Sequence, residues 1–75
     1  MLEKILQAFD ENGIYTDKDD LNAQLDMDSI QYVSLIVSLE DLFDINFPDD
    51  YLGDNVATTV NEFLAAVTEL TRTDN

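Results

Sequence analysis

The segment from residue 29 to residue 44 restricts the possible folds most, because apolar residues cover most of its circumference when it is drawn as a helix. Its polar residues form only a narrow stripe at three- and four-residue steps: Gln31, Ser34, Ser38 and Asp41. A helix that is apolar nearly all round has to be covered by neighbouring elements. We therefore expect this segment to form the central helix of the core.

Two further segments carry the helical period on one face only. The first has apolar residues at Leu2, Ile5, Leu6 and Phe9, and the second has them at Val60, Phe63, Leu64 and Val67. Gly13 follows the first segment, where a helix is expected to end in the left-handed conformation. Thr59 and Glu62, spaced by three, predict a capping box at the start of the second. One helix is therefore expected near each end of the chain.

Two less regular segments connect these helices. Residues 12–28 form a long connection, and we expect Leu21 and Leu25 within it to pack into the core. Pro48 suits the start of a short helix around residues 49–52, which Gly53 would end. With no alternating strand pattern and no repeat, the predicted fold is an all-α bundle of three main helices plus one short helix, in a single domain spanning residues 1–75.

The start of the central helix is the candidate functional site. Asp28 is expected to cap this helix, with Gln31 completing a capping box and Met27 packing on Tyr32. Ser29 then occupies the first helical position, where backbone N–H groups have no partner within the helix. A serine here is common for capping alone, but a phosphate attached to it would also be stabilised by the helix dipole. The local pattern leaves both interpretations open.

Composition excludes several classes of site. The chain has no histidine and no cysteine, so catalysis by histidine, a cysteine nucleophile and a disulfide are all excluded. A calcium loop starting at Asp17 fits poorly, because Asn22 stands where glycine is needed and Asp28 where glutamate is needed. The acidic pairs at residues 19–20 and 49–50 are expected to be solvated charges.

The charge balance indicates what kind of partner suits the chain. Its 75 residues include 17 acidic and only three basic ones, which gives a formal net charge of −14. The basic residues Lys4, Lys18 and Arg72 are scattered, so nucleic acid is not an expected partner, whereas basic protein surfaces are. No apolar run is long enough to span a membrane and no signal peptide is recognised, so we expect a cytoplasmic protein. We also expect a monomer.

A series of short motifs then follows in order along nearly the whole chain. These are Asp28-Ser29-Ile30, Glu40-Asp41-Leu42-Phe43 with Ile45, Phe47-Pro48, and Thr58-Thr59-Val60 before the last helix. In this order and spacing the chain resembles the acyl and peptidyl carrier proteins, whose attachment motif is Asp-Ser-Leu or Asp-Ser-Ile. The tripeptide alone is unspecific, and its position before an apolar helix in a short acidic chain makes the resemblance specific.

The resemblance implies a non-enzymatic carrier. Ser29 would accept a 4′-phosphopantetheine arm from coenzyme A, installed by a separate Mg²⁺-dependent phosphopantetheinyl transferase. The thiol of the arm would hold an acyl or aminoacyl cargo as a thioester. The implied partners are that transferase, a loading ligase for the acyl or aminoacyl group, and downstream synthase enzymes.

The chain also departs from the carriers of bacterial fatty acid synthesis. Gln31, Ser34 and Ser38 occupy positions where those carriers usually have acidic residues, and Met27 stands where a small residue is common. These differences favour a specialised fatty acid, polyketide or nonribosomal peptide pathway. Met27, Ile30, Gln31 and Ser34 are the predicted partner-binding residues, whereas Val33 is expected in the core.

Two alternatives stay open. One is a non-catalytic acidic module that binds a protein partner without any covalent group, and the other is a hydrolase that uses pairs of carboxylates.

Overall fold

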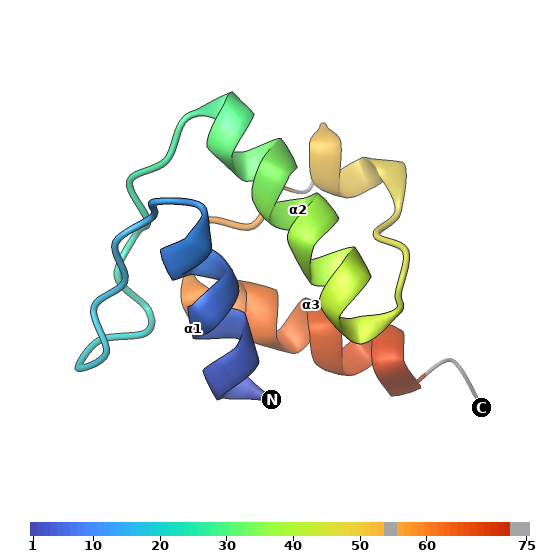
Figure 1. Ribbon diagram of the computed structural model, residues 1–75, viewed down its shortest axis with the longest axis horizontal. Coiled ribbons are helices and arrows are strands. Elements are labelled where there is room, and N and C mark those ends of the chain that lie inside the picture. Colours follow the sequence, from blue (N-terminus) through green and yellow to red (C-terminus); the bar gives the residue numbers. More distant parts are fainter. Residues whose placement is uncertain (54–55, 73–75) are drawn as a thin grey trace.

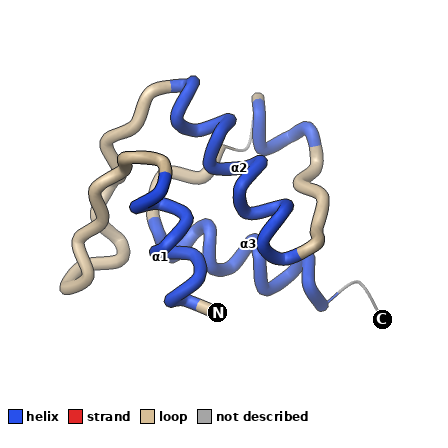
Figure 2. The backbone as a smooth tube through the Cα atoms, viewed as in Figure 1, coloured by secondary structure: helices blue, strands red, loops and turns tan. Residues whose placement is uncertain are grey.

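The computed structural model describes residues 1–53 and 56–72, and within them helices are joined by irregular connections (Figure 1). The elements are α1 (Leu2–Glu11), α2 (Ser29–Phe43), the short 3-10 helix η1 (Asp49–Leu52) and α3 (Val60–Arg72). No strand occurs in these residues (Figure 2). The predicted all-α bundle of three main helices and one short helix is therefore confirmed.

The core forms where the apolar faces of α1, α2 and α3 meet, and each helix contacts the other two. Phe9 of α1 and Phe63 of α3 are both fully buried, and their rings meet edge to face with centroids 5.3 Å apart. The central helix α2 contributes four buried residues, namely Tyr32, Leu35, Ile36 and Leu39. Burial of these large side chains supplies most of the stabilising free energy of so small a core.

One side of α2 remains uncovered, contrary to the expectation that its neighbours would enclose it. Val33 was expected in the core, but it is 47% exposed, so that prediction was wrong. The physical reason is geometric: α1 and α3 contact α2, and among residues 1–53 and 56–72 the remaining helix, η1, is too short to cover the rest of its surface.

Two residues in the left-handed conformation end the first two helices. Gly13 has φ 71° after α1, and the amide groups of Gly13 and Ile14 donate to the carbonyls of Asp10 and Phe9, as in a Schellman motif. Asp44 takes the same role after α2 with φ 55°, although glycine adopts this conformation at lower cost. The predicted end of the first helix at Gly13 is confirmed.

The start of α3 is held by the predicted capping box. The Glu62 amide donates to Thr59 Oγ1 at 3.2 Å, and the Thr59 amide donates to Glu62 Oε1 at 3.1 Å. Thr58 adds two further bonds to the same carboxylate oxygen, from its amide and from its hydroxyl. These hydrogen bonds favour the charged form of Glu62, and they hold its pKa below the ordinary value.

The long connection 12–28 is attached to the segment where α3 begins. The Leu25 amide donates to the Thr58 carbonyl at 2.8 Å, and the Asn61 amide donates to the Leu21 carbonyl at 3.1 Å. Leu21 and Leu25 are partly buried against the core, as predicted. The chain that leads into α2 is therefore fixed to α3 as well as to α2 itself.

Candidate functional site

The candidate site begins with a complete capping box at the start of α2. Asp28 Oδ1 accepts a hydrogen bond from the Gln31 amide at 2.8 Å, and the Asp28 amide donates to Gln31 Oε1 at 3.2 Å. The predicted cap is therefore present, with both of its reciprocal bonds. It fixes the first turn of α2 and so the direction in which the next residue points.

Ser29 follows the cap as the first residue of α2, and its side chain is exposed. Its hydroxyl makes no hydrogen bond to the residues that the structure describes. The other two serines of the chain differ in this respect, because Ser34 Oγ donates to Asn12 Oδ1 at 2.7 Å and Ser38 Oγ accepts from Asn12 Nδ2 at 3.1 Å. Ser29 is thus the serine whose hydroxyl is free to react at an accessible helix start.

Three residues of the polar stripe of α2, namely Gln31, Ser34 and Ser38, face the end of α1. Gln31 Nε2 donates to the carbonyls of Asn12 and Gly13, at 3.4 Å each, in addition to its part in the capping box. Together with the bonds of Ser34 and Ser38, this makes Asn12 the centre of a polar joint between α1 and α2. Sequence reasoning missed Asn12, whose position directly after a predicted helix gave no sign of these partners.

Exposed apolar side chains lie along α2 beyond the serine. Ile30, Val33 and Val37 are 80%, 47% and 58% exposed, and their three- and four-residue spacing places them on one side of the helix. We call these three residues the apolar ridge. Of the four predicted partner-binding residues, Ile30 belongs to the ridge, Met27 is partly buried, and Gln31 and Ser34 are engaged with Asn12. Val37 was missed, because an apolar residue in a mostly apolar helix gives no sign of which side is covered.

A hollow of about 360 Å³ opens beside Ser29. Its walls come from the connection before α2, from α2, from the end of η1 and from the chain before α3, and they combine apolar with uncharged polar groups and one carboxylate. The lining residues are Gln24, Leu25, Met27, Asp28, Ser29, Tyr32, Leu52, Val56, Ala57 and Thr58. The serine hydroxyl therefore lies at the edge of a partly apolar recess, which Met27 and Tyr32 both border.

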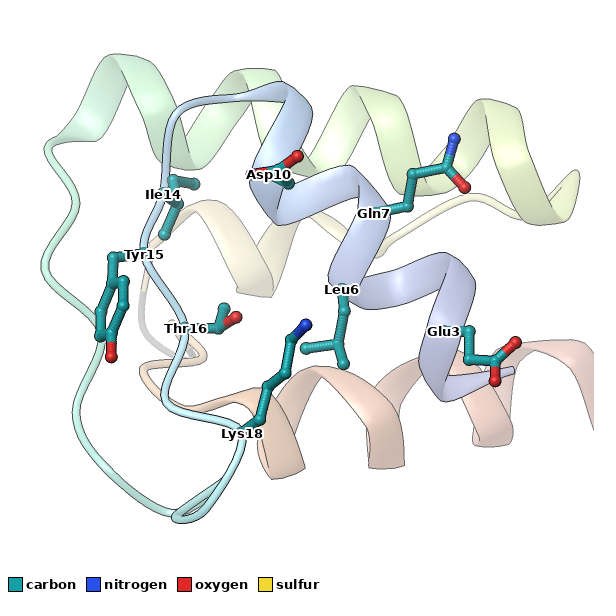
Figure 3. A pocket seen from close by; sticks show the side chains of 8 residues that line it. All are labelled: Glu3, Leu6, Gln7, Asp10, Ile14, Tyr15, Thr16 and Lys18. Carbon is teal, nitrogen blue, oxygen red and sulfur yellow. The ribbon is translucent and has the colours of Figure 1, made fainter.

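A larger hollow of about 550 Å³ lies apart from this site, between the outer face of α1 and residues 14–18 (Figure 3). It includes none of the predicted site residues. Glu3 and Asp10 place negative charges on its border, and Lys18 places a positive charge there.

Among residues 1–53 and 56–72 the structure brings together no group of three or more metal-binding side chains. Within the same residues no helix is long and apolar enough to cross a membrane.

A short helical bundle with a free serine at the capped start of its central helix is the arrangement of a carrier domain with a covalently attached arm. The chain matches the family described as "phosphopantetheine attachment site" over residues 1–67, and it belongs to that family. No curated protein and no solved structure gives a significant match. Domains of this family carry a covalently bound 4′-phosphopantetheine group, and they act as carriers that are generally not catalytic.

The residues at the start of α2 fit such a group. An exposed hydroxyl at the first helical position provides the oxygen for a phosphodiester, and the unpaired N–H groups and positive dipole end of the first turn favour a phosphate there. The recess beside the hydroxyl leaves room next to the attachment point.

Proposed function

We propose that this chain is an acyl or peptidyl carrier protein whose Ser29 bears 4′-phosphopantetheine. One observation carries the assignment to Ser29: it is the exposed serine with a free hydroxyl, whereas Ser34 and Ser38 are bound to Asn12. When attached, the arm supplies a thiol that can hold a cargo as a thioester. The chain itself has no cysteine, so its sulfur chemistry would depend on that arm.

The capped start of α2 suits the attachment reaction. Ser29 Oγ would form a bond to the phosphorus of coenzyme A that carries the pantetheine, the pyrophosphate P–O bond would break, and the adenosine bisphosphate would leave. A base and Mg²⁺ of the transferase would take the hydroxyl proton and offset the phosphate charge. Asp28 would orient the serine through the capping box.

The apolar ridge is the surface that we assign to partner enzymes. Ile30 follows Ser29 directly, so an enzyme that receives the arm would lie against Ile30 and, farther along α2, against Val33 and Val37. Gln31 and Ser34 are neutral and are engaged with Asn12, so we expect their effect on recognition to be indirect. The surrounding acidic charge would speed encounters with basic enzyme surfaces.

A mostly apolar recognition surface favours a specialised fatty acid, polyketide or nonribosomal peptide pathway. In such a pathway a loading ligase would attach the acyl or aminoacyl group to the arm, and synthase enzymes would receive it. We propose that residues 1–75 act as one carrier domain and as a monomer. We also propose that its contacts with enzymes are weak and reversible, which suits a carrier that visits several enzymes in turn.

The test is the intact mass of the purified protein before and after incubation with coenzyme A, Mg²⁺ and a phosphopantetheinyl transferase of broad specificity. Wild type is expected to gain the mass of one phosphopantetheine group. Ser29→Ala should gain nothing, while the matched variant Ser34→Ala should gain the same mass as wild type. If wild type gains no mass with this or with its native transferase, the carrier function fails, and an acidic protein-interaction module becomes the better interpretation.

A further inference from the structure

Tyr32 borders both the hollow beside Ser29 and the core. It is only 7% exposed and belongs to the core cluster. On its inner side the ring packs against Phe63 of α3, with centroids 5.9 Å apart, and Phe63 is fully buried. A chain that passed from the hollow toward Phe63 on this side would therefore have to displace the Tyr32 ring.

The ring is fixed by its hydroxyl as well as by packing. Tyr32 Oη donates to the backbone carbonyl of Tyr51 in η1, and it accepts from the Ala57 amide at 3.3 Å. Tyr51 in turn packs edge to face on Phe47, with ring centroids 5.2 Å apart. One hydroxyl thus links α2, η1 and the chain before α3, and burial raises the pKa of this hydroxyl above its ordinary value.

Displacing the ring would leave buried polar groups without partners. The Ala57 amide lies in a buried residue, and the hydrogen bond it donates to Tyr32 would be lost. The fully buried residues behind the ring would also lose their packing. An alkyl chain gains free energy with each methylene that it buries, but here that gain would be offset by the cost of opening the core.

We propose that Tyr32 keeps the cargo of the arm out of the helical bundle, so that a cargo linked through Ser29 stays in the surface hollow and in solvent. This inference rests on the proposed carrier function and specifies the cargo further. The hollow offers apolar contacts from Met27, Leu52 and Val56 beside polar groups from Gln24 and Thr58. A short or polar acyl or aminoacyl group suits such a recess, whereas a long saturated chain would be left exposed.

The experiment loads Ser29 with non-hydrolysable pantetheine analogues that carry short, medium and long saturated chains. Intact mass first establishes that each form is loaded, and the Tm of each form is then measured. The wild-type Tm is expected to be independent of chain length. In Tyr32→Val, where the ring is removed, the long-chain form should melt several degrees above the short-chain form, because the chain can now enter the core.

Tyr32→Phe is the companion variant, because it keeps the ring and removes only its two hydrogen bonds. We expect its Tm to depend on chain length less than that of Tyr32→Val and more than that of wild type. If Tyr32→Val does not fold, Tyr32→Phe is compared with wild type alone. A wild-type Tm that rises with chain length, with all forms loaded, would overturn the inference about Tyr32 and leave the carrier function intact. A failure of wild type to load would overturn both.

Discussion

The Ser34 hydroxyl of α2 donates a hydrogen bond to the side chain of Asn12, at 2.7 Å, just beyond the end of α1. The same side chain also donates to the Ala8 carbonyl at 2.8 Å and to Ser38 Oγ at 3.1 Å. Asn12 therefore satisfies groups on both helices at once. Gln31, Ser34 and Ser38 of the polar stripe are in this way part of the joint between two helices.

Replacing Asn12 with alanine should destabilise the fold by about 1–2 kcal/mol, because several partly buried hydrogen bonds are lost together. Urea denaturation at neutral pH measures the change in the free energy of unfolding. Asn46→Ala, at an exposed position, is the matched control and should change it by less than about 0.5 kcal/mol. Equal effects of the two substitutions would show that the joint does not stabilise the fold.

Asp28→Ala should lower the free energy of unfolding by about 1 kcal/mol, since it removes the side chain that caps α2. Asp26→Ala removes one acidic charge nearby but leaves the capping box intact, and it should have little effect. Urea denaturation of both variants separates capping from charge. If Asp26→Ala were as destabilising as Asp28→Ala, charge rather than the cap would account for the loss.

The left-handed ends of α1 and α2 predict opposite effects of two substitutions. Gly13→Ala should destabilise the fold by about 1 kcal/mol, because alanine tolerates a φ of 71° poorly. Asp44→Gly should stabilise it by up to about 1 kcal/mol, because it relieves the same conformational cost at φ 55°. Thermal unfolding of the two variants tests this, and shifts of Tm in the same direction would contradict it.

Two positions on α2 distinguish the covered side from the apolar ridge. Leu35→Ala should cost about 2–5 kcal/mol, because the side chain is fully buried. Val33→Ala, at a position that is 47% exposed, should cost far less than Leu35→Ala. The free energies of unfolding of the two variants test this comparison.

Val33→Ala also tests the ridge as a recognition surface, once the variant is shown to be close to wild type in stability. A slower reaction of Val33→Ala with a partner enzyme would support that role, and an unchanged rate would argue against it.

The capping box of α3 predicts a change of stability with pH. The hydrogen bonds from Thr58 and Thr59 hold the pKa of Glu62 below its ordinary value of 4.5, so the stabilisation it gives is complete above that pH and is lost as the pH falls through the folded-state pKa. In Glu62→Gln this acid-dependent loss should be absent. In wild type the loss of stability should stay below about 1 kcal/mol, because the Glu62 side chain is exposed to solvent.

Chemical denaturation of wild type and Glu62→Gln at several pH values between neutral and acidic gives the comparison. Glu69→Gln, farther along α3, controls for the removal of one carboxylate from this acidic chain. A constant difference between wild type and Glu62→Gln across the pH range would contradict the prediction.

The sequence predicted most of the helices and their ends, because those features are local. The period of apolar residues placed α1, α2 and α3, and the spacing of Asp28 with Gln31 and of Thr59 with Glu62 predicted both capping boxes. Each depends on residues within a few positions of one another. The prediction of a short helix before Gly53 was confirmed for the same reason.

The features that sequence did not predict depend on which elements meet in space. Val33 and Leu35 are both apolar residues of one apolar helix, and only the placement of α1 and α3 decides that one is exposed and the other buried. Ser34 and Ser38, the partners of Asn12 on α2, lie far from it along the chain. Tyr51 and Ala57, which hold the Tyr32 hydroxyl, are likewise far from Tyr32. A single sequence contains no periodic pattern for such contacts.

Leu25 lies shortly before Ser29 in the chain, and its amide donates a hydrogen bond to the Thr58 carbonyl. This bond affects how an arm attached to Ser29 would move. It secures the chain before the serine to the start of α3, while the helix after the serine is secured by its own packing. An arm on Ser29 would thus pivot about a point held from both directions. The volume swept by its free end would then be set by the torsions of the arm, with little added by movement of the protein beneath it.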